Sequence, residues 1–400
     1  SSDLLSQIGR GGGIRPLIAL AKSNNLHSQC LALSSLRRLG FIRENRDKLV
    51  AEGILETLTS ACKSAEPEIQ REVASCFCNL SLSSNHRLNI ARLSISELVT
   101  LANSDDFETV RLSLGALGNL AEGIDTHSFM RSAPILGTIV GCLEREEVDI
   151  KREAARVIAN LLSSFEIHSY IIQCGLDSLI LLSAYTCEEC RYLTALSFRK
   201  LSPTISNMAM NANPSQFPLD IWGVCSSLIS LIKDQDGKTK KYAATALRDL
   251  SASGKNDIIF FKLRMPAAMV ELVKDNDKDV QIIAVATLRH LSSSDRIKDV
   301  FDGSGIVQSA IRCISWANED LRCQIAGLFA NLSEHRECQS TMVSNGIVQA
   351  VDTLLSIEHN EIWQDCSRAL ANLCANEGNQ AIIRRQGGIK TLAKLSKSNK

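Results

Sequence analysis

The chain has 400 residues and no net formal charge; 45% of its residues are hydrophobic but only 4% are aromatic. A net charge of zero does not favour nucleic acid or a membrane surface as the partner, and no apolar run reaches the ~18 residues that cross a bilayer. The cysteines lack a disulfide spacing and mostly occupy apolar positions of helical patterns, which indicates a reducing compartment, the cytosol or the nucleus.

A unit of three helices can be read from residues 45–81. Asn45 opens a short helix that ends at Gly53, a second short helix follows, and a longer amphipathic helix runs over about residues 68–80. Apolar residues in that longer helix recur at spacings of three and four, which places them on one face of an α-helix. The glycine predicts a left-handed cap between the first two helices. It recurs as Gly175, Gly305, Gly346 and Gly387.

The unit repeats along the whole chain. Each longer helix closes with a small or apolar residue, a larger one such as Leu or Phe, any residue, a polar residue and Leu, as in residues 116–120. Successive copies lie 40 or 41 residues apart, with one step of 49. The closing leucines are Leu39, Leu80, Leu120, Leu161, Leu201, Leu250, Leu291, Leu332 and Leu373. Such a period predicts a single repeat domain over residues 1–400, in which each unit buries its apolar face against its neighbours.

The step of 49 adds residues between the copies that close at Leu201 and Leu250. Three prolines fall in the extra segment, so we predict a loop insertion over about residues 202–220. A tolerated surface loop is one interpretation, and an element that contacts a partner is the other. Residues 379–400 look like the first two helices of a further, partial copy.

Three helices in about 40 residues, a Gly-Ile step into the second helix and an Ala-Leu-x-Asn-Leu end to the third resemble the armadillo repeat. The resemblance covers essentially the whole chain and is greatest to vacuolar armadillo adaptors and β-catenin-type arrays. It implies an all-α, right-handed α-solenoid (superhelix) of about nine to ten repeats. It also implies that the third helices line a concave groove in which other proteins bind.

In the family, a column of asparagines on the third helices bonds the backbone of an extended ligand, because an amide both donates and accepts. The column here holds Asn79, Asn119, Asn160, Asn331 and Asn372. Lys200, Asp249 and His290 interrupt it between two blocks. Alternatively, each amide only bonds the neighbouring helix or loop. The position four residues earlier lacks the Trp of nuclear import adaptors, which disfavours import of that kind.

Basic residues recur on the same side of the predicted third helices. One stripe gathers Arg38, Arg71, Arg111, Arg152, Arg156, Lys200 and Lys241. Asp249 is the one acid in this stripe, and the acids that balance the chain mostly lie in turns before third helices. We therefore expect charge to be separated by face, with a basic groove and an acidic rim. The alternative is a solvated face whose arginines pair with acids such as Glu72 or Glu153.

Motifs that could carry chemistry are few. Cys187 and Cys190 form a lone CxxC with no second pair, so we expect a structural role. His86, His127 and His168 recur at steps of 41. Stacked helices ~8–10 Å apart cannot easily bring such a column to ~2 Å from one metal, so turn residues are predicted. We expect no catalytic residue, no enzyme activity, no cofactor, no metal and no small-molecule substrate.

These features predict a scaffold or adaptor that holds an extended acidic segment of a partner protein in the basic groove. One alternative is the substrate-recognition arm of a larger enzyme such as a ubiquitin ligase. Another is nucleic-acid binding, which the lack of aromatics on the groove disfavours. Because the chain starts at Ser1 and stops within a repeat, we expect a fragment of a longer protein. The expected location is the cytoplasm, the nucleus or the periphery of an organelle membrane, reached through a lipid anchor or partner outside this chain.

Overall fold

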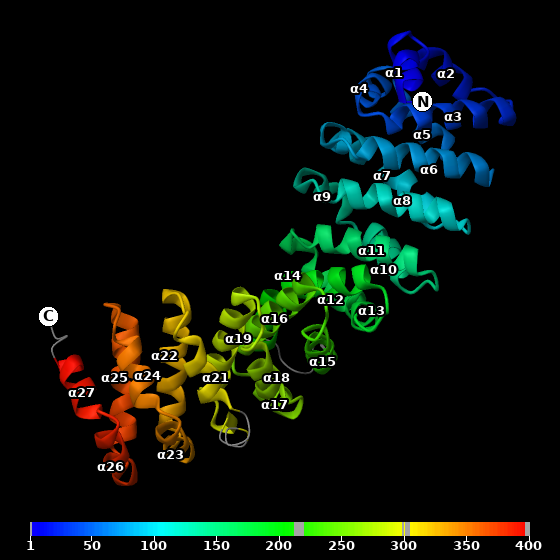
Figure 1. Cartoon of the computed structure of the whole chain (residues 1–400). Coiled ribbons are helices and arrows are strands. Elements are labelled where there is room, and N and C mark those ends of the chain that lie inside the picture. Colours follow the sequence, from blue (N-terminus) through cyan, green and yellow to red (C-terminus); the bar gives the residue numbers. More distant parts are fainter. Residues whose placement is uncertain (1, 212–219, 298–299, 301–304, 397–400) are drawn as a thin grey trace. The chain divides into compact units, whose positions relative to one another are not determined.

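The computed structural model describes residues 2–211, 220–297, 300 and 305–396. All regular structure in this described part is helical, so the all-α prediction is confirmed (Figure 1). None of the described helices is both long enough and apolar enough to cross a membrane. The chain divides into two compact units, residues 1–200 (unit 1) and 201–400 (unit 2), and each is described by itself.

Unit 1 contains five copies of the repeat; in the third copy one continuous helix, Ser84–Ala102, takes the place of the first and second helices. Its helices are α1 (Ser2–Arg10), α2 (Ile14–Ala21), α3 (Leu26–Phe41), α4 (Arg43–Ala51), α5 (Ile54–Ala61), α6 (Pro67–Ser81), α7 (Ser84–Ala102), α8 (Phe107–Leu120), η1 (Ile124–Thr126), α9 (His127–Met130), α10 (Ala133–Leu143), α11 (Val148–Leu161), η2 (Phe165–Ile167), α12 (His168–Cys174), α13 (Leu176–Leu182) and the start of α14 (Glu188–Asn211). The third helices of these copies are α3, α6, α8, α11 and α14.

Unit 2 continues the pattern. Its helices are α15 (Ile221–Leu231), α16 (Gly237–Ser251), α17 (Asp257–Lys262), α18 (Met265–Leu272), α19 (Lys278–Leu291), η3 (Asp295–Ile297), α21 (Ile306–Cys313), α22 (Glu319–Glu334), α23 (Arg336–Ser344), α24 (Ile347–Leu354), α25 (Asn360–Cys374), α26 (Glu377–Arg385) and α27 (Gly388–Ser396). The third helices here are α16, α19, α22 and α25. The last two helices are the first two of a further copy, as the pattern of residues 379–400 predicts.

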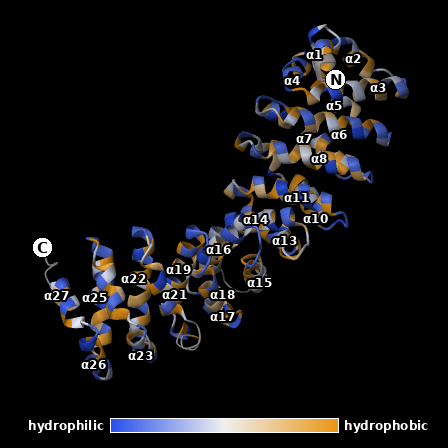
Figure 2. Ribbon diagram, viewed as in Figure 1, coloured by the Kyte–Doolittle hydropathy of each residue, from blue (hydrophilic) through white to orange (hydrophobic). Residues whose placement is uncertain are grey.

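Third helices pack on one another in series within each unit. In unit 1, α3 packs on α6, α6 on α8 and α8 on α11; in unit 2, α16 packs on α19, α19 on α22 and α22 on α25 (Figure 1). All nine closing leucines of the motif are buried. Apolar and polar residues alternate along the helices in Figure 2, as expected where each helix turns one face to its neighbours. This serial packing is that of an α-solenoid, so the predicted fold class is confirmed.

A recurring side-chain contact joins seven of the third helices to the next copy. A residue in the following first helix donates to a carbonyl six residues earlier, where a helix end leaves carbonyls without intrahelical partners. The pairs are Asn45 to Leu39, Arg87 to Ser81, Asn256 to Leu250, Gln339 to Ser333 and Gln380 to Cys374. In His127 and His168 the Nε2 atom bonds the carbonyl in the same way, at 2.8 and 3.0 Å. These two histidines are therefore turn residues, as predicted; His86 instead pairs with Asp47 at 2.7 Å.

The left-handed cap is present at four of the five glycines for which the sequence predicts it. Gly53, Gly305, Gly346 and Gly387 have positive φ angles. Gly175 does not, because its φ is −118°, so the prediction of a left-handed cap is wrong at that position. In the copy closed by Leu291, Arg264 takes the left-handed conformation with φ 55°. A non-glycine residue there costs about 1 kcal/mol of backbone strain.

The predicted loop at residues 202–220 is wrong for its first half. Helix α14 continues through Pro203 to Asn211. Proline removes one backbone hydrogen bond from a helix, yet its fixed φ is helical. Leu201 and Ile205 are buried on either side of it, and their packing favours continuation of the helix. The other two prolines of the segment, at 214 and 218, lie outside the described residues.

Candidate partner-binding surface

The asparagine column links neighbouring third helices. Asn79 Nδ2 donates to the Arg37 carbonyl at 3.1 Å, and Asn160 Nδ2 donates to the Gly118 carbonyl at 3.0 Å. In each pair the acceptor lies 42 residues earlier, on the preceding third helix. Lys200 replaces an asparagine but keeps the contact, since its Nζ lies 2.6 Å from the Ala159 carbonyl. The column therefore has a structural role in joining repeats, whatever it binds.

Asn119 lies at the centre of a polar cluster in unit 1. Its Nδ2 donates to the Cys78 carbonyl at 3.3 Å and to Ser81 Oγ at 3.0 Å. Its Oδ1 accepts from Arg156 Nη1 at 3.1 Å. The same guanidinium donates to the Gly115 carbonyl at 2.9 Å. We call residues 119, 122, 153, 156 and 160 the Asn119 cluster; Glu153 and Glu122 lie 2.8 and 4.0 Å from Arg156.

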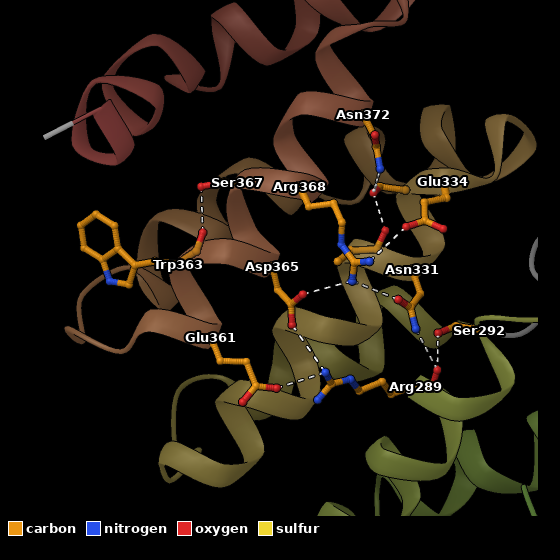
Figure 3. Close-up of polar contacts among 12 residues, drawn as sticks. Arg289, Ser292, Asn331, Glu334, Glu361, Trp363, Asp365, Ser367, Arg368 and Asn372 are labelled. Atoms are coloured by element: carbon orange, nitrogen blue, oxygen red, sulfur yellow. Dashed lines mark hydrogen bonds and ion pairs between the residues drawn. The ribbon is translucent and has the colours of Figure 1, made fainter. Parts of the chain in front are cut away.

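Unit 2 contains a matching set, which Figure 3 shows. We call Asn331, Glu334, Asp365, Arg368 and Asn372 the Asn331 cluster. Each member follows its counterpart in unit 1 by 212 residues, as 331 follows 119. Arg368 Nη2 again donates to an asparagine Oδ1, that of Asn331, at 3.2 Å, and it contacts Asp365 at 3.0 Å (Figure 3). Glu334 lies 3.2 Å from Arg368 Nη1.

These contacts divide the asparagine column into closed and open positions. Asn119 and Asn331 are closed, because their Oδ1 atoms accept from an arginine and their Nδ2 atoms donate to the preceding repeat. Asn79, Asn160 and Asn372 are open, because no described residue donates to their Oδ1 atoms. The open positions keep both lone pairs of Oδ1 for the backbone N–H of a ligand, whereas the arginine takes one of the two at each closed position.

The expectation that basic and acidic residues occupy separate faces is wrong. Arg71 makes a two-pronged pair with Asp106 at 2.7 and 3.2 Å. Arg111 pairs with Glu108 at 2.7 Å. Arg152 lies 2.7 Å from Asp149 and 3.4 Å from Glu189, and Lys241 pairs with Asp279. The acids expected to form a rim therefore neutralise the predicted basic stripe.

The stacking of repeats explains this neutralisation. Asp106 caps the N-terminus of α8, which favours an acid, and packing places that turn beside Arg71 of α6. Hydrogen bonds from the Arg71 guanidinium lower the pKa of the Asp106 carboxyl to about 2. Pairs at a separation of 35 residues recur and were readable from the sequence. They are Arg37–Glu72, Arg71–Asp106, Arg87–Glu122, Arg131–Glu166 and Lys240–Asp275.

The remaining predicted residues differ in environment. Arg38 is exposed and makes no ion pair with any described residue. Burial lowers the pKa of the Lys200 ammonium, which also donates to Ser163 Oγ at 2.9 Å. Asp249, the acid of the stripe, lies 2.8 Å from Arg248 and accepts from Ser202 at 3.0 Å. The stripe is thus a mixed polar surface, in which two of the predicted bases, Arg38 and Lys200, make no ion pair with a described residue.

Arg289 was missed by reasoning from the sequence. From α19 its guanidinium lies 3.1 Å from Glu361 and 3.7 Å from Asp365, both on α25 (Figure 3). The side chain passes over Gly327 of α22, where a Cβ atom would lie 2.2 Å from Arg289 Nε. A glycine in the middle of a third helix, one repeat after an arginine, was the available signal.

The CxxC pair and the histidines form no metal site within the described residues, where no group of three or more suitable side chains converges. Cys187 immediately precedes α14, and Cys190 is buried within its first turn. Burial raises the pKa of the Cys190 thiol to about 12, which keeps it protonated and unreactive at neutral pH. These cysteines carry no assigned chemistry.

Serial third helices, positive-φ glycines and an asparagine column define an armadillo-type α-solenoid, the class of protein that the sequence resembles. No protein-family model matches the chain. Vacuolar protein 8 of Schizosaccharomyces pombe is 29% identical over 162 residues, which are 38% of this chain and 30% of that protein. Vacuolar protein 8 of Saccharomyces cerevisiae is 25% identical over 162 residues, or 38% and 28% of the two chains. The match thus spans less than a third of these relatives' length.

Two solved structures share the fold over most of the chain. An engineered protein superposes with a TM-score of 0.77 at 22% identity, covering 93% of this chain and 91% of that one. A structure from work on a phosphorylation switch in the interaction between cadherin and β-catenin superposes with a TM-score of 0.76 at 14% identity. It covers 95% of this chain and 80% of that one. Together with the vacuolar relatives, these likenesses confirm the resemblance to armadillo-repeat proteins.

Proposed function

We propose that this chain is a protein-binding scaffold or adaptor that holds an extended acidic segment of a partner along the third helices of unit 1. The observation that carries the proposal is the row formed by Arg71, Arg111 and Arg152. They occupy one position on three successive third helices, and each is partly exposed in a surface ion pair. The similarity to Vacuolar protein 8 supports a scaffold without enzymatic activity of its own.

Binding proceeds by exchange of ion pairs. An exposed pair contributes only about 0–1 kcal/mol, so a partner carboxylate replaces the internal acid at little cost. Glu108 and Asp149 are exposed and leave their arginines easily. Asp106 also caps α8 through Thr109, so the Arg71 pair is the slowest to exchange. Arg111 and Arg152 are therefore the principal contacts for the acidic segment.

The spacing of the repeats suits an extended segment. Stacked helices lie ~8–10 Å apart, and an extended chain advances ~3.3 Å per residue, so about every third residue meets the next repeat. The open amides of Asn79 and Asn160 flank the arginine row and accept backbone N–H groups. Asn119 is closed and contributes only to packing.

A peripheral location on an organelle membrane is part of the proposal. Its support is the name of the relatives, vacuolar protein 8, and the absence of a membrane-crossing helix in the described residues. Attachment then depends on a lipid anchor or a partner outside this chain. Nucleic acid is a poor alternative ligand, because no aromatic side chain on which a base could stack lies among the predicted groove residues.

The test uses a fluorescein-labelled synthetic peptide with Glu at every third position and the whole chain. We expect the triple variant R111E/R152E/R71E to lose binding, and R111Q/R152Q/R71Q to weaken it with less disturbance of the fold. The control K22E/K63E/R92E changes charge equally at exposed bases without ion pairs in the described structure. Circular dichroism melting shows whether each variant is folded. Normal binding by both folded triple variants would refute the arginine row as the site.

A further inference from the structure

Large apolar side chains are exposed at each of four successive repeat junctions in unit 1. Phe41 ends α3, Leu82 follows α6, Ile124 opens η1 and Phe165 opens η2. Their exposed fractions are 70%, 49%, 75% and 76%. Scattered exposed apolar residues are ordinary, but one at each of four successive junctions is a recurring feature, and exposed apolar residues that recur along one edge mark a candidate interaction site.

Phe41 and Leu82 lie two residues after the closing leucine of their third helix, and Ile124 and Phe165 lie four residues after theirs. The C-terminal ends of α3, α6, α8 and α11 lie side by side, so the four residues follow one edge of unit 1 (Figure 1). Inter-repeat ion pairs hold this edge together: Arg87 with Glu122 at 2.6 Å, and Arg131 with Glu166. We call Phe41, Leu82, Ile124 and Phe165 the junction ridge. Unit 2 lacks it: the positions that match Phe41 and Leu82 carry Ala252, Ser293, Glu334 and Ala375, and those that match Ile124 and Phe165 carry Gly254, Asp295, Arg336 and Glu377.

In the ion pairs beside the ridge, the acid is more exposed than the base. In the Arg87–Glu122 pair the acid is 46% exposed and the base 16%; in the Arg131–Glu166 pair the values are 63% and 54%. Asp125 adds a further exposed acid next to Ile124. Arg43, beside Phe41, is an exposed base at the other end of the ridge. From Leu82 to Phe165 the ridge therefore offers apolar side chains flanked by outward acids.

The spacing of the ridge selects the form of its partner. Repeats stack ~8–10 Å apart, and seven residues of an α-helix rise about 10.5 Å while returning to almost the same face. An extended strand covers that distance in about three residues, which puts successive contacts on opposite faces. A helix with an apolar residue at every seventh position can therefore contact successive residues of the junction ridge with one face.

We propose that the junction ridge binds an amphipathic, basic α-helix of a partner protein. Its apolar face packs on Leu82, Ile124 and Phe165, and its lysines or arginines meet Glu122, Asp125 and Glu166. Outward acids disfavour an anionic membrane as the occupant, because like charges repel. The site is separate from the arginine row of the third helices, so the chain holds two partners or two parts of one partner.

The experiment uses a labelled, Ala-based synthetic helix of about 25 residues with Leu at every seventh position and Lys beside each Leu. A matched peptide carries Glu in place of Lys. Fluorescence anisotropy measures binding to the wild-type chain, to I124S/F165S and to the control L181S, whose leucine is 70% exposed on α13. These surface changes leave the core intact, and circular dichroism checks the fold.

We expect the Lys peptide to bind the wild type and L181S alike and to bind I124S/F165S at least about tenfold more weakly. The Glu peptide is expected to bind the wild type at least about tenfold more weakly than the Lys peptide. Equal binding of the Lys peptide to I124S/F165S and to wild type, or equal binding of the two peptides, overturns the proposal. So does sedimentation equilibrium showing a wild-type dimer that I124S/F165S abolishes, since the occupant is then a second copy. Ridge-dependent sedimentation with phosphatidylserine vesicles overturns it in favour of a lipid surface.

Discussion

The Asn119 and Asn331 clusters have the same five polar positions but balance their acids differently. In unit 1, Arg152 contacts Asp149 and Glu153 on its own helix and Glu189 on the next third helix. The counterpart of Arg152 in unit 2 is Gln364, and the cation comes instead from Arg289, two third helices away. The partly buried acid of each cluster needs a nearby cation. The repeat architecture allows that cation to come from different helices in the two units.

The long reach of Arg289 has a structural consequence. Its side chain contacts Gln324 of α22 at 3.4 Å as well as Glu361 and Asp365 of α25. One residue therefore links three consecutive third helices, whereas nearest-neighbour contacts are the rule in a solenoid. The route is open only because Gly327 has no side chain. Unit 2 thus has a side chain that couples repeats two steps apart, whereas the side-chain contacts described for unit 1 couple only adjacent repeats.

The largest expected difference between the clusters lies in their asparagines. Asn119 is buried and donates to two acceptors, whereas Asn331 is half-buried and donates to one. N119A leaves the Cys78 carbonyl and Arg156 with fewer partners, and we expect a loss of about 2 kcal/mol in unfolding free energy. N331A is expected to cost about 1 kcal/mol. Urea unfolding followed by circular dichroism compares them; equal costs would show that the two clusters are energetically equivalent.

The second prediction concerns the source of the cation. R289A leaves Asp365 Oδ2, which is buried and accepts no hydrogen bond, with Arg368 as the nearest remaining cation. We expect a loss of about 1 kcal/mol, with faster hydrogen exchange in both α22 and α25. R152A is expected to cost about 0.5 kcal/mol and to affect only α11 and the adjacent α14, because the acids that Arg152 contacts lie on those two helices. Exchange confined to α19 in R289A would contradict coupling across three helices.

A smaller effect is expected from pH. It concerns His168 of unit 1, whose role at the repeat junction is taken by Gln339 in unit 2. Burial lowers the pKa of His168 below its ordinary 6.5, and Lys200 adds to that effect. The unfolded chain therefore binds a proton more readily, so stability is complete above pH 6.5 and falls as pH drops below it. H168Q places at this position the residue that Gln339 provides in unit 2. We expect its melting temperature to depend less on pH over that range than the wild type's does. An unchanged slope would contradict a burial effect at His168.

The regular parts of the fold could be predicted because they depend on local periodicity. Nine buried leucines follow from apolar spacing, and the role of His127 and His168 follows from their place at a turn. Pro203 led to the wrong prediction of a loop. Its fixed φ is helical, so it fits within α14, where packing supports the helix. Separation of charge by face was the wrong interpretation, because a stripe read along single helices omits the turn of the next repeat, where Asp106 lies. Arg289 was missed because Glu361 lies 72 residues away, two repeats further on.

The smallest expected effect tests whether a glycine is needed where an arginine crosses a helix. A Cβ at Gly118 would lie 2.6 Å from Arg156 Cζ, whereas Ala330 occupies the matching position in unit 2 and Arg368 still reaches Asn331. G118A therefore displaces a flexible guanidinium but leaves the backbone unchanged. Alanine favours a helix over glycine by about 1 kcal/mol, which offsets the weakened contacts of Arg156, so we expect almost no net change.

A double-mutant cycle separates those two contributions at Gly118. In the R156A background there is no side chain to displace, so G118A should stabilise the protein by about the full 1 kcal/mol of helix preference. The difference between the two backgrounds measures the cost of moving the guanidinium. If G118A has the same effect in both, Arg156 crosses the helix without depending on the glycine. The route of Arg289 over Gly327, where the approach is closer at 2.2 Å, would then be the only crossing of the two that requires one.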